Sequence, residues 1–321
     1  MFSALRKAAT SVSTAEVINF GNLKVLTTGQ LAEGGYSYVY SAREVGARTR
    51  LFAVKKMVTQ DAETRACAEM EMALLQRFSG SAGFVKCYGA ITRTPVKGVT
   101  EHLMLLEYCP NGSLIDIVYK KGRSGEFEKL PPLSVDRVLE VFEMVAIGVA
   151  RMHAEEPAVA HRDLKLENVL GAPGGQYVLC DFGSATTRRL PAERSRRELI
   201  EEEERISKFS TLMYRAPEMV DLYRNHQIDE KVDIWALGCI LFTLTYQEHP
   251  FSSESSLQIL NAAYHIPEGS GRPRALQALI GSLLTPDPAE RITAAEAISR
   301  TQQLRRREEP GWVAEVLARF A

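Results

Sequence analysis

The residues from 161 to 168, with the sequence HRDLKLEN, have types and spacings that suit the transfer of a phosphoryl group. Asp163 can take a proton from a hydroxyl, and Lys165 can neutralise charge on a migrating phosphoryl group. Asn168 follows Asp163 by five residues, and Asp181 follows it by eighteen. Mg²⁺ is a hard cation that prefers oxygen ligands, such as a carboxamide or a carboxylate. The four residues therefore predict a magnesium-assisted phosphoryl-transfer site.

Such a site needs elements that hold a nucleotide, and residues 22–58 are predicted to form strands and turns that could do so. Gly34 and Gly35 lie in a turn, where the absence of a Cβ lets backbone N–H groups approach phosphates. A hairpin turn between surface strands explains the two glycines equally well. Lys55 lies in a largely apolar strand, residues 51–57, where an unpaired charge is costly to bury. Lys55 therefore needs an acidic partner.

Residues 61–78 predict a helix that can supply this partner. The apolar positions at helical spacing are Met70, Ala73, Leu74 and Phe78. Glu71, which stands sixteen residues after Lys55, and Glu69 are the two candidates. A solvated helix face remains the structural alternative for either glutamate.

The second half of the chain is predicted to be mostly helical, in contrast to the strand-rich first half. Residues 134–153 form a long amphipathic helix, whose apolar side belongs to the core rather than to a cofactor site. The change in pattern predicts two lobes, residues 22–108 and residues 109–305, in an α+β fold. Residues 1–21 are expected to be a disordered or extended leader. Residues 306–321 predict a C-terminal helix that folds back on the large lobe or, alternatively, binds a partner.

Composition and charge narrow the class of protein. The 321 residues are 45% hydrophobic and 25% charged, which is typical of a soluble globular protein. A net charge of −1 provides no global basic field, so no nucleic-acid partner is expected. The five cysteines are scattered and include no C-x-x-C pair, which favours free thiols in a reducing, cytoplasmic compartment. No apolar run reaches the roughly 18 residues that a transmembrane segment requires.

The chain resembles the eukaryotic protein kinase family over about residues 22 to 300. The resemblance rests on HRDLKLEN, on the Asp-Phe-Gly sequence that begins at Asp181, on the Ala-Val-Lys sequence that ends at Lys55, and on the Ala-Pro-Glu sequence that ends at Glu218. It implies a bilobal protein-kinase fold, with a small β-rich N-lobe that carries one helix (αC) and a larger, mostly helical C-lobe. It also implies ATP and Mg²⁺ as cofactors.

On the nucleotide side, the resemblance implies that Lys55 orients the α- and β-phosphates of ATP and that Glu71 holds Lys55. The residues that match the family's nucleotide pocket are Leu31, Gly34, Val39, Ala53, Lys55, Leu106, Glu107, Cys109, Asn168, Leu170 and Asp181. The backbone around Glu107 would bond the adenine edge. The glycine loop departs from the family pattern, because Ala32 and Ser37 replace the outer two of its three glycines.

On the catalytic side, the resemblance implies that Asp163 accepts or orients the proton of the substrate hydroxyl and that Lys165 steadies the γ-phosphate. Asn168 and Asp181 would hold Mg²⁺. Lys165 is typical of the serine/threonine class, and Thr211 matches the threonine that bridges Asp163 and Lys165 in that class. The function that this implies is an ATP-dependent serine/threonine protein kinase. The altered glycine loop motivates an alternative, a pseudokinase that serves as a scaffold or binding module.

The segment from residue 181 to residue 218 spans 37 residues, which is long for this family, and it carries a dense run of charges. The i, i+4 pairs Glu201–Arg205 and Glu204–Lys208 favour a helical insert, although a solvated loop explains the charges equally well. This segment resembles the Numb-associated kinase family, through GSATT at 183–187, the acidic run and MYRAPEMVDLY at 213–223. That family includes the cyclin-G-associated, adaptor-associated and yeast actin-regulating kinases.

The narrower resemblance implies clathrin-adaptor or actin-regulatory proteins as partners, and a cytoplasmic location peripheral to vesicles or the plasma membrane. It also implies an extra helix after the usual course of the Ala-Pro-Glu segment. Arg162, beside Asp163, could order this segment by binding a phosphate on one of its hydroxyl groups. The candidates are Thr186, Thr187, Ser195, Ser207 and Ser210. We also consider that the acidic run makes phosphorylation unnecessary.

Two charged residues of the second half are predicted to be structural anchors. Asp233, at the start of a buried helix, would bind the backbone of the catalytic loop. Arg291 would pair with Glu218. The resemblance implies no direct catalytic role for either residue.

Overall fold

The computed structural model describes residues 15–34, 37–46, 50–122, 126–251 and 255–308. The chain divides into two units. The first comprises the residues up to Asn111 together with Ala172–Gly174, and the second comprises Gly112–Gly171 and the residues from Gly175 onward. Strands dominate the first unit and helices the second, so the α+β fold class is confirmed.

The first unit is built on an antiparallel sheet with the strand order β1-β2-β3-β4-β6-β5. The strands are β1 (Val17–Asn19), β2 (Lys24–Glu33), β3 (Ser37–Glu44), β4 (Leu51–Thr59), β5 (Cys87–Val96) and β6 (Val99–Glu107). Strand β1 lies in the stretch that was expected to be a leader, and Val17 pairs with Leu26 of β2. The sheet therefore begins before the predicted border at residue 22, whereas residues 1–14 lie outside the described part of the chain.

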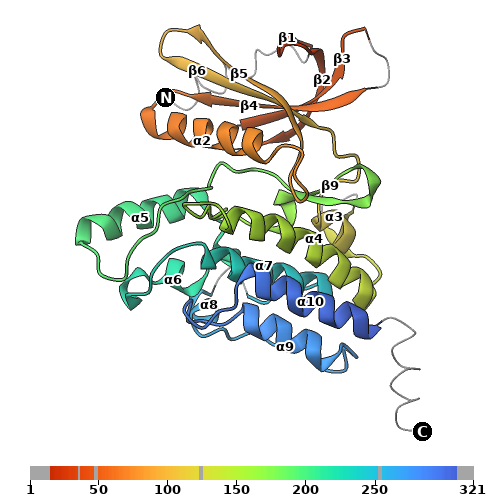
Figure 1. The fold of residues 1–321 in the computed structure, drawn as a ribbon, viewed down its shortest axis with the longest axis vertical. Helices are drawn as coiled ribbons and strands as arrows, with labels where there is room; N and C mark the ends of the chain where they lie inside the picture. The colour runs from red at the N-terminus through yellow and green to blue at the C-terminus, as the bar shows by residue number, and fades with distance from the viewer. Residues whose placement is uncertain (1–14, 35–36, 47–49, 123–125, 252–254, 309–321) are drawn as a thin grey trace. The chain divides into compact units, whose positions relative to one another are not determined.

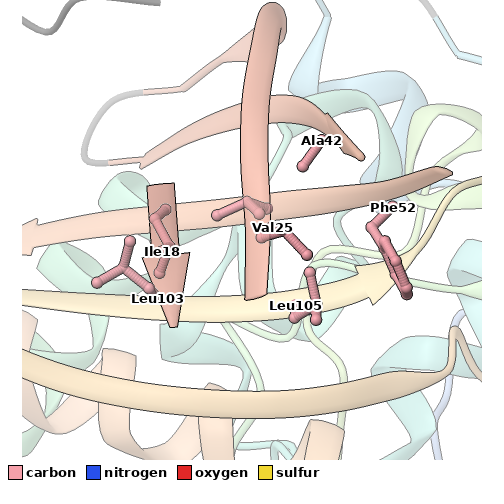
Figure 2. Close-up of a cluster of buried hydrophobic side chains, with 7 residues drawn as sticks. Ile18, Val25, Ala42, Phe52, Leu103 and Leu105 are labelled. Atoms are coloured by element: carbon pink, nitrogen blue, oxygen red, sulfur yellow. The ribbon is translucent and has the colours of Figure 1, made fainter. Parts of the chain in front are cut away.

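One face of this sheet carries an apolar core. Its buried members are Ile18, Val25, Ala42, Phe52, Val54, Leu103 and Leu105. Figure 2 shows six of these side chains gathered from β1, β2, β3, β4 and β6. Because successive side chains of a strand point to opposite faces, Phe52 and Val54 on this face leave Ala53 and Lys55 on the other.

Helix α2 (Ala62–Phe78) is the predicted helix of the first unit, and it runs alongside the sheet (Figure 1). Asp61 caps its first turn, because its carboxylate accepts a hydrogen bond from the backbone N–H of Thr64 at 2.8 Å. The buried positions are Thr64, Ala68, Glu71, Leu74, Leu75 and Phe78. Of the four apolar positions at helical spacing, Leu74 and Phe78 are buried, whereas Met70 and Ala73 are exposed. The buried stripe includes the polar Thr64 and Glu71, which apolar periodicity does not indicate.

The second unit is organised around two long helices, α4 (Val135–His153) and α7 (Lys231–Tyr246). The predicted amphipathic helix at 134–153 is confirmed as α4, with Ser134 as its cap. Helix α7 is buried from Val232 to Thr245. The other helices are α3 (Ile115–Val118), α5 (Arg196–Phe209), α6 (Pro217–Val220), α8 (Ser256–Leu260), α9 (Arg274–Leu283) and α10 (Ala294–Glu308). Figure 1 shows α10 alongside α4, the pair of helices with the most extensive mutual packing.

Short elements complete the second unit and place its loops. Two antiparallel pairs join β7 (Tyr119–Lys121) to β8 (Phe127–Lys129) and β9 (Val169–Gly171) to β10 (Tyr177–Leu179). Single 3₁₀ turns occur at Leu166–Asn168, Leu212–Tyr214 and Leu222–Arg224, and a further one at Pro173–Gly175 spans the division between the two units. Residues 306–308 are the end of α10, and the remainder of the predicted C-terminal helix, 309–321, lies outside the described residues. Among the described helices, none has both the length and the apolar character needed to cross a membrane.

The charged segment between residues 181 and 218 contains helix α5, as its charge pattern favoured. Ser195 and Glu198 form a reciprocal capping box at its first turn. An i, i+4 ion pair joins Arg197 to Glu201, with Nε and Oε1 2.8 Å apart, so Glu201 binds an arginine one turn earlier than the predicted Arg205. The helix ends at Phe209, so it precedes the Ala-Pro-Glu sequence, whereas the family resemblance implied a helix after it.

Candidate active site

The catalytic loop follows α4 and is fastened by a carboxylate of α7. Asp233, which is 1% exposed, accepts hydrogen bonds from the backbone N–H groups of His161 at 2.7 Å and Arg162 at 2.9 Å. His153 binds the same carboxylate at 2.9 Å. Burial by itself would raise the pKa of Asp233, but the hydrogen bonds from His153 and His161 lower it overall. The carboxylate therefore stays ionised, and the predicted anchor of the loop is present.

The carboxylate of Asp233 also stabilises an unusual backbone conformation at Arg162. Arg162 has a φ of 67°, in the left-handed region that non-glycine residues rarely adopt. Its N–H bond to Asp233 helps to stabilise this conformation, and the turn places the next residue, Asp163, at the centre of the loop.

Asp163, Lys165 and Thr211 form one hydrogen-bonded network. Lys165 Nζ lies 2.8 Å from Asp163 Oδ2 and 3.0 Å from Thr211 Oγ1. The Thr211 hydroxyl donates to Asp163 Oδ1 at 2.8 Å, and the Thr211 N–H donates to the same oxygen at 3.0 Å. The structure thus brings Thr211 to the two residues that it was predicted to bridge. An aspartate and a lysine held together in this way suit a reaction that moves a proton and a phosphoryl group.

Asn168 and Asp181 lie at the same end of the β9–β10 pair. Asn168 directly precedes β9, Asp181 follows β10 by two residues, and Val169 is paired with Leu179. A backbone bond from Cys180 N to Asn168 O, 3.0 Å long, closes this end. The pairing of two short strands therefore brings together residues that are thirteen apart in the sequence.

These two residues suit a hard cation. The amide nitrogen of Asn168 donates to the backbone oxygen of Asp163 at 2.8 Å and to its Oδ2 at 3.3 Å, so the amide oxygen points away from Asp163. Asp181 is exposed, although Phe182 beside it is fully buried and fixes the chain there. One carboxylate and one carboxamide oxygen fit a magnesium ion that also binds a nucleotide's phosphates. Among the described residues, no group of three or more His, Cys, Asp or Glu side chains could hold a metal ion.

In the first unit, Lys55 has the acidic partner that its burial requires. Its Nζ lies 2.6 Å from Glu71 Oε1, with the two side chains 8% and 0% exposed. Glu69 is exposed, so the choice of Glu71 over Glu69 agrees with the structure. The ion pair with Glu71 fixes the position of the buried Lys55 side chain.

The other predicted nucleotide residues of the first unit mostly share one face of the sheet. Val39 is paired with Lys55, and Ala53 with Leu106, so all four point to the face opposite the apolar core. Leu31 and Gly34 lie at the end of β2; Leu31 is exposed, and Gly34 N donates to Ser37 O at 2.8 Å. Gly35 lies outside the described residues.

Glu107 ends β6, and Cys109 lies two residues beyond it, half-buried. Burial, with a smaller contribution from the charge of Glu107, raises the pKa of the Cys109 thiol to about 12. This thiol is therefore protonated near neutral pH, and none of the five cysteines, all of which lie in the described part of the chain, forms a disulfide bond. Leu170, the remaining predicted pocket residue, is half-buried in β9 of the second unit.

The identity of the family follows from this arrangement and from comparison with known proteins. Residues 26–301 match the family model of the protein kinase domain, and the chain belongs to this family. A probable serine/threonine-protein kinase of Dictyostelium discoideum is 38% identical over 292 residues, which cover 90% of this chain and 35% of that protein. A second probable serine/threonine-protein kinase of the same organism is 35% identical over 291 residues, covering 90% of this chain and 25% of its own length.

A protein kinase domain-containing protein of Schizosaccharomyces pombe is 36% identical over 263 residues, which cover 81% of this chain and 39% of that protein. The chain therefore spans well under half the length of these curated relatives. Nothing in these comparisons supports the scaffold alternative, and the names of the relatives do not refer to the Numb-associated family.

One contact of the site was not anticipated from the sequence. The side chain of Arg162 binds Glu202 of α5, with Nη1 and Oε1 2.6 Å apart. The acidic run at 201–204 was noted, but no partner was predicted for Glu202. Glu202 and Ile206 are the buried residues of α5 and are four apart, so helical periodicity held a signal for the inward-facing glutamate.

Proposed function

We propose that this chain is an ATP-dependent serine/threonine protein kinase that transfers the γ-phosphate of ATP to a hydroxyl group of a protein. The observation that carries the proposal is the network of Asp163, Lys165 and Thr211 beside Asn168. Phosphoryl transfer needs little covalent help from a protein, so the residues act mainly by positioning groups and balancing charge.

In this mechanism, Asp163 accepts or orients the proton of the attacking hydroxyl. Lys165 balances negative charge that develops on the γ-phosphate, and Thr211 keeps the two side chains in register. Asn168 and Asp181 would hold Mg²⁺, which supplies charge neutralisation for the phosphates of ATP. In the first unit, Lys55 would contact the α- and β-phosphates, with Glu71 fixing its position.

Incubation of the purified chain with γ-labelled Mg-ATP and a generic protein substrate tests this proposal. We expect label on serine and threonine after acid hydrolysis of the substrate. Label on tyrosine alone would contradict the proposed class, and tight Mg-ATP binding without any transfer would contradict the proposed activity.

We also propose that the substrates include clathrin-adaptor or actin-regulatory proteins and that the kinase works in the cytoplasm at vesicles or the plasma membrane. The support is the resemblance of residues 183–187 and 213–223 to the Numb-associated kinases. A peptide array that includes adaptor-derived threonine peptides tests the substrate class. Adaptor peptides that are phosphorylated no better than scrambled peptides of equal composition would contradict it.

A further inference from the structure

We propose that Glu202 is a positioning residue for phosphoryl transfer. Its carboxylate occupies the place beside Arg162 that a phosphate on the segment 181–218 would otherwise bind, and it makes phosphorylation of that segment unnecessary. The inference rests on the proposed kinase activity. It assigns the role to one residue of the acidic run and to the contact that this residue makes.

Glu202 is buried, and its charge is balanced by arginine. Its side chain is 2% exposed, and that of Arg162 is 8% exposed. Besides the 2.6 Å contact with Arg162, Glu202 Oε2 lies 3.7 Å from Arg188 Nε. Arg162 Nη2 also donates to the backbone oxygen of Arg188 at 3.2 Å, which brings both arginines to one place. This contact differs from a surface salt bridge because water is largely excluded from it.

Three arginines, Arg162, Arg188 and Arg194, interact with the Glu202 carboxylate. Burial lowers the pKa of Arg194, and the charge of Glu202 opposes that shift, so a third guanidinium group senses the same carboxylate. Glu202 Oε2 makes no hydrogen bond among the described residues, and Arg188 Nε lies 3.7 Å from it. Clustered arginines are the usual partners of a phosphate group. Here the chain supplies a glutamate at the same place.

Both partners of the Arg162–Glu202 contact are connected through the chain to the network of Asp163, Lys165 and Thr211. Arg162 directly precedes Asp163, and α5 ends at Phe209, two residues before Thr211. Between these ends, Ile206 is buried, and Ser210 accepts a hydrogen bond from Arg215 Nε at 2.9 Å. A shift of α5 away from Arg162 would therefore act on Thr211 and Asp163, so Glu202 acts through other residues and not on the substrate.

Three of the candidate hydroxyl groups already serve local structure. Ser195 caps α5, Thr186 Oγ1 accepts from the N–H of Arg188 at 3.0 Å, and Ser210 Oγ donates to Ile206 O at 2.5 Å. A phosphate on any of these would displace a bond that fixes the segment. The guanidinium of Arg162, which a phosphate would seek, is engaged by Glu202. These contacts favour an active enzyme without a phosphate in this segment.

The test compares Glu202→Gln with Glu203→Gln, since Glu203 is an exposed neighbour on the same helix. Turnover is measured with labelled Mg-ATP and a generic protein substrate, after phosphatase treatment that mass spectrometry shows to be complete. We expect Glu202→Gln to lower kcat by roughly tenfold to a hundredfold with the KM for ATP nearly unchanged, because the loss is one of positioning. We expect Glu203→Gln and the phosphatase-treated wild type to keep their turnover.

Three further variants separate positioning from folding. Arg162→Gln should lower kcat as much as Glu202→Gln, and the double variant should lower it little further, because the two residues act as one unit. Glu202→Asp keeps the charge and should retain more turnover than Glu202→Gln at an equal melting temperature. If Glu202→Gln does not fold, the Asp variant and Arg162→Gln still provide the comparison.

Equal turnover of Glu202→Gln and Glu203→Gln would overturn the inference, as would a large loss of wild-type turnover after phosphatase treatment. Additive losses for Arg162→Gln and Glu202→Gln would also overturn it. In each of these cases the wild-type protein still transfers phosphate, so the kinase activity stands. A wild-type protein that transfers no phosphate would contradict the proposed function itself.

Discussion

Replacement of Arg291 by methionine should strongly destabilise the second unit. Arg291 is 1% exposed, and its guanidinium binds both oxygens of Glu218, at 2.7 Å and 2.9 Å. Its remaining N–H groups donate to the backbone oxygens of Thr285 at 2.8 Å, Lys231 at 2.7 Å and Pro286 at 3.1 Å. All five donors of the guanidinium are therefore used. This agrees with the pairing of Arg291 and Glu218 that the sequence predicted.

The magnitude follows from what the substitution leaves behind. Methionine preserves much of the apolar volume but leaves Glu218, 1% exposed, as a buried carboxylate without its cation. Breaking a buried ion pair from one side costs about 3–5 kcal/mol. That loss is a large fraction of the roughly 5–15 kcal/mol that stabilises a typical domain. We therefore expect the free energy of unfolding to fall by about 3–5 kcal/mol.

Urea unfolding followed by tryptophan fluorescence measures this loss at the site. The Trp235 ring lies against Arg291, with the guanidinium carbon 5.3 Å from the ring centre. The only other tryptophan is Trp312, and Trp312→Phe makes the signal specific to Trp235. The matched control is Arg197→Met. The Arg197 side chain is 87% exposed, so this substitution should leave the midpoint of urea unfolding unchanged. A loss below about 1 kcal/mol for Arg291→Met would refute the reasoning.

Three further predictions follow from single residues. Burial lowers the pKa of His249 from 6.5 to about 4. The contribution of the neutral His249 to the free energy of unfolding should therefore be complete above pH 6.5 and fall by about 1 kcal/mol near pH 5.5. In urea titrations, His249→Gln should show a smaller loss over this range. Gly238→Ala should cost about 1–3 kcal/mol by thermal unfolding, because its Cβ would lie 2.7 Å from Leu284 Cδ2; an unchanged melting temperature would contradict this packing. Glu71→Gln should lower kcat/KM for ATP by roughly tenfold or more, whereas the exposed Glu69→Gln should not; equal losses would contradict the choice of partner.

The parts of the site that were predicted from the sequence are those set by short spacings. Asn168 and Asp181 meet because two short strands pair between them, and such a pairing needs few residues. The burial of Lys55 predicted a carboxylate on the next helix, and the family resemblance chose Glu71 over Glu69 as that partner. Thr211 lies forty-eight residues from Asp163, and it was placed by family resemblance and not by any local pattern.

The features that the sequence did not predict depend on packing between distant segments. Strand β1 has only three residues, and its pairing with β2, not its own pattern, makes it a strand. Arg162 and Glu202 are forty residues apart, and which glutamate of the run at 201–204 faces inward depends on how α5 packs. In α2, the exposure of Met70 has the same origin, because the buried stripe of the helix contains Glu71 and not Met70. The signals were present, but tertiary contacts decided among them.

The measurement that tests the central claim most directly is single-turnover phosphoryl transfer by Asp163→Asn, together with its affinity for Mg-ATP. The substitution keeps the shape of the side chain but removes the charge that holds Lys165 and Thr211. The matched control is Asp136→Asn, whose side chain is 65% exposed on α4. We predict that Asp163→Asn lowers transfer by roughly a thousandfold with Mg-ATP binding nearly unchanged and that Asp136→Asn matches the wild type. Transfer by Asp163→Asn at a rate close to that of Asp136→Asn would contradict the account.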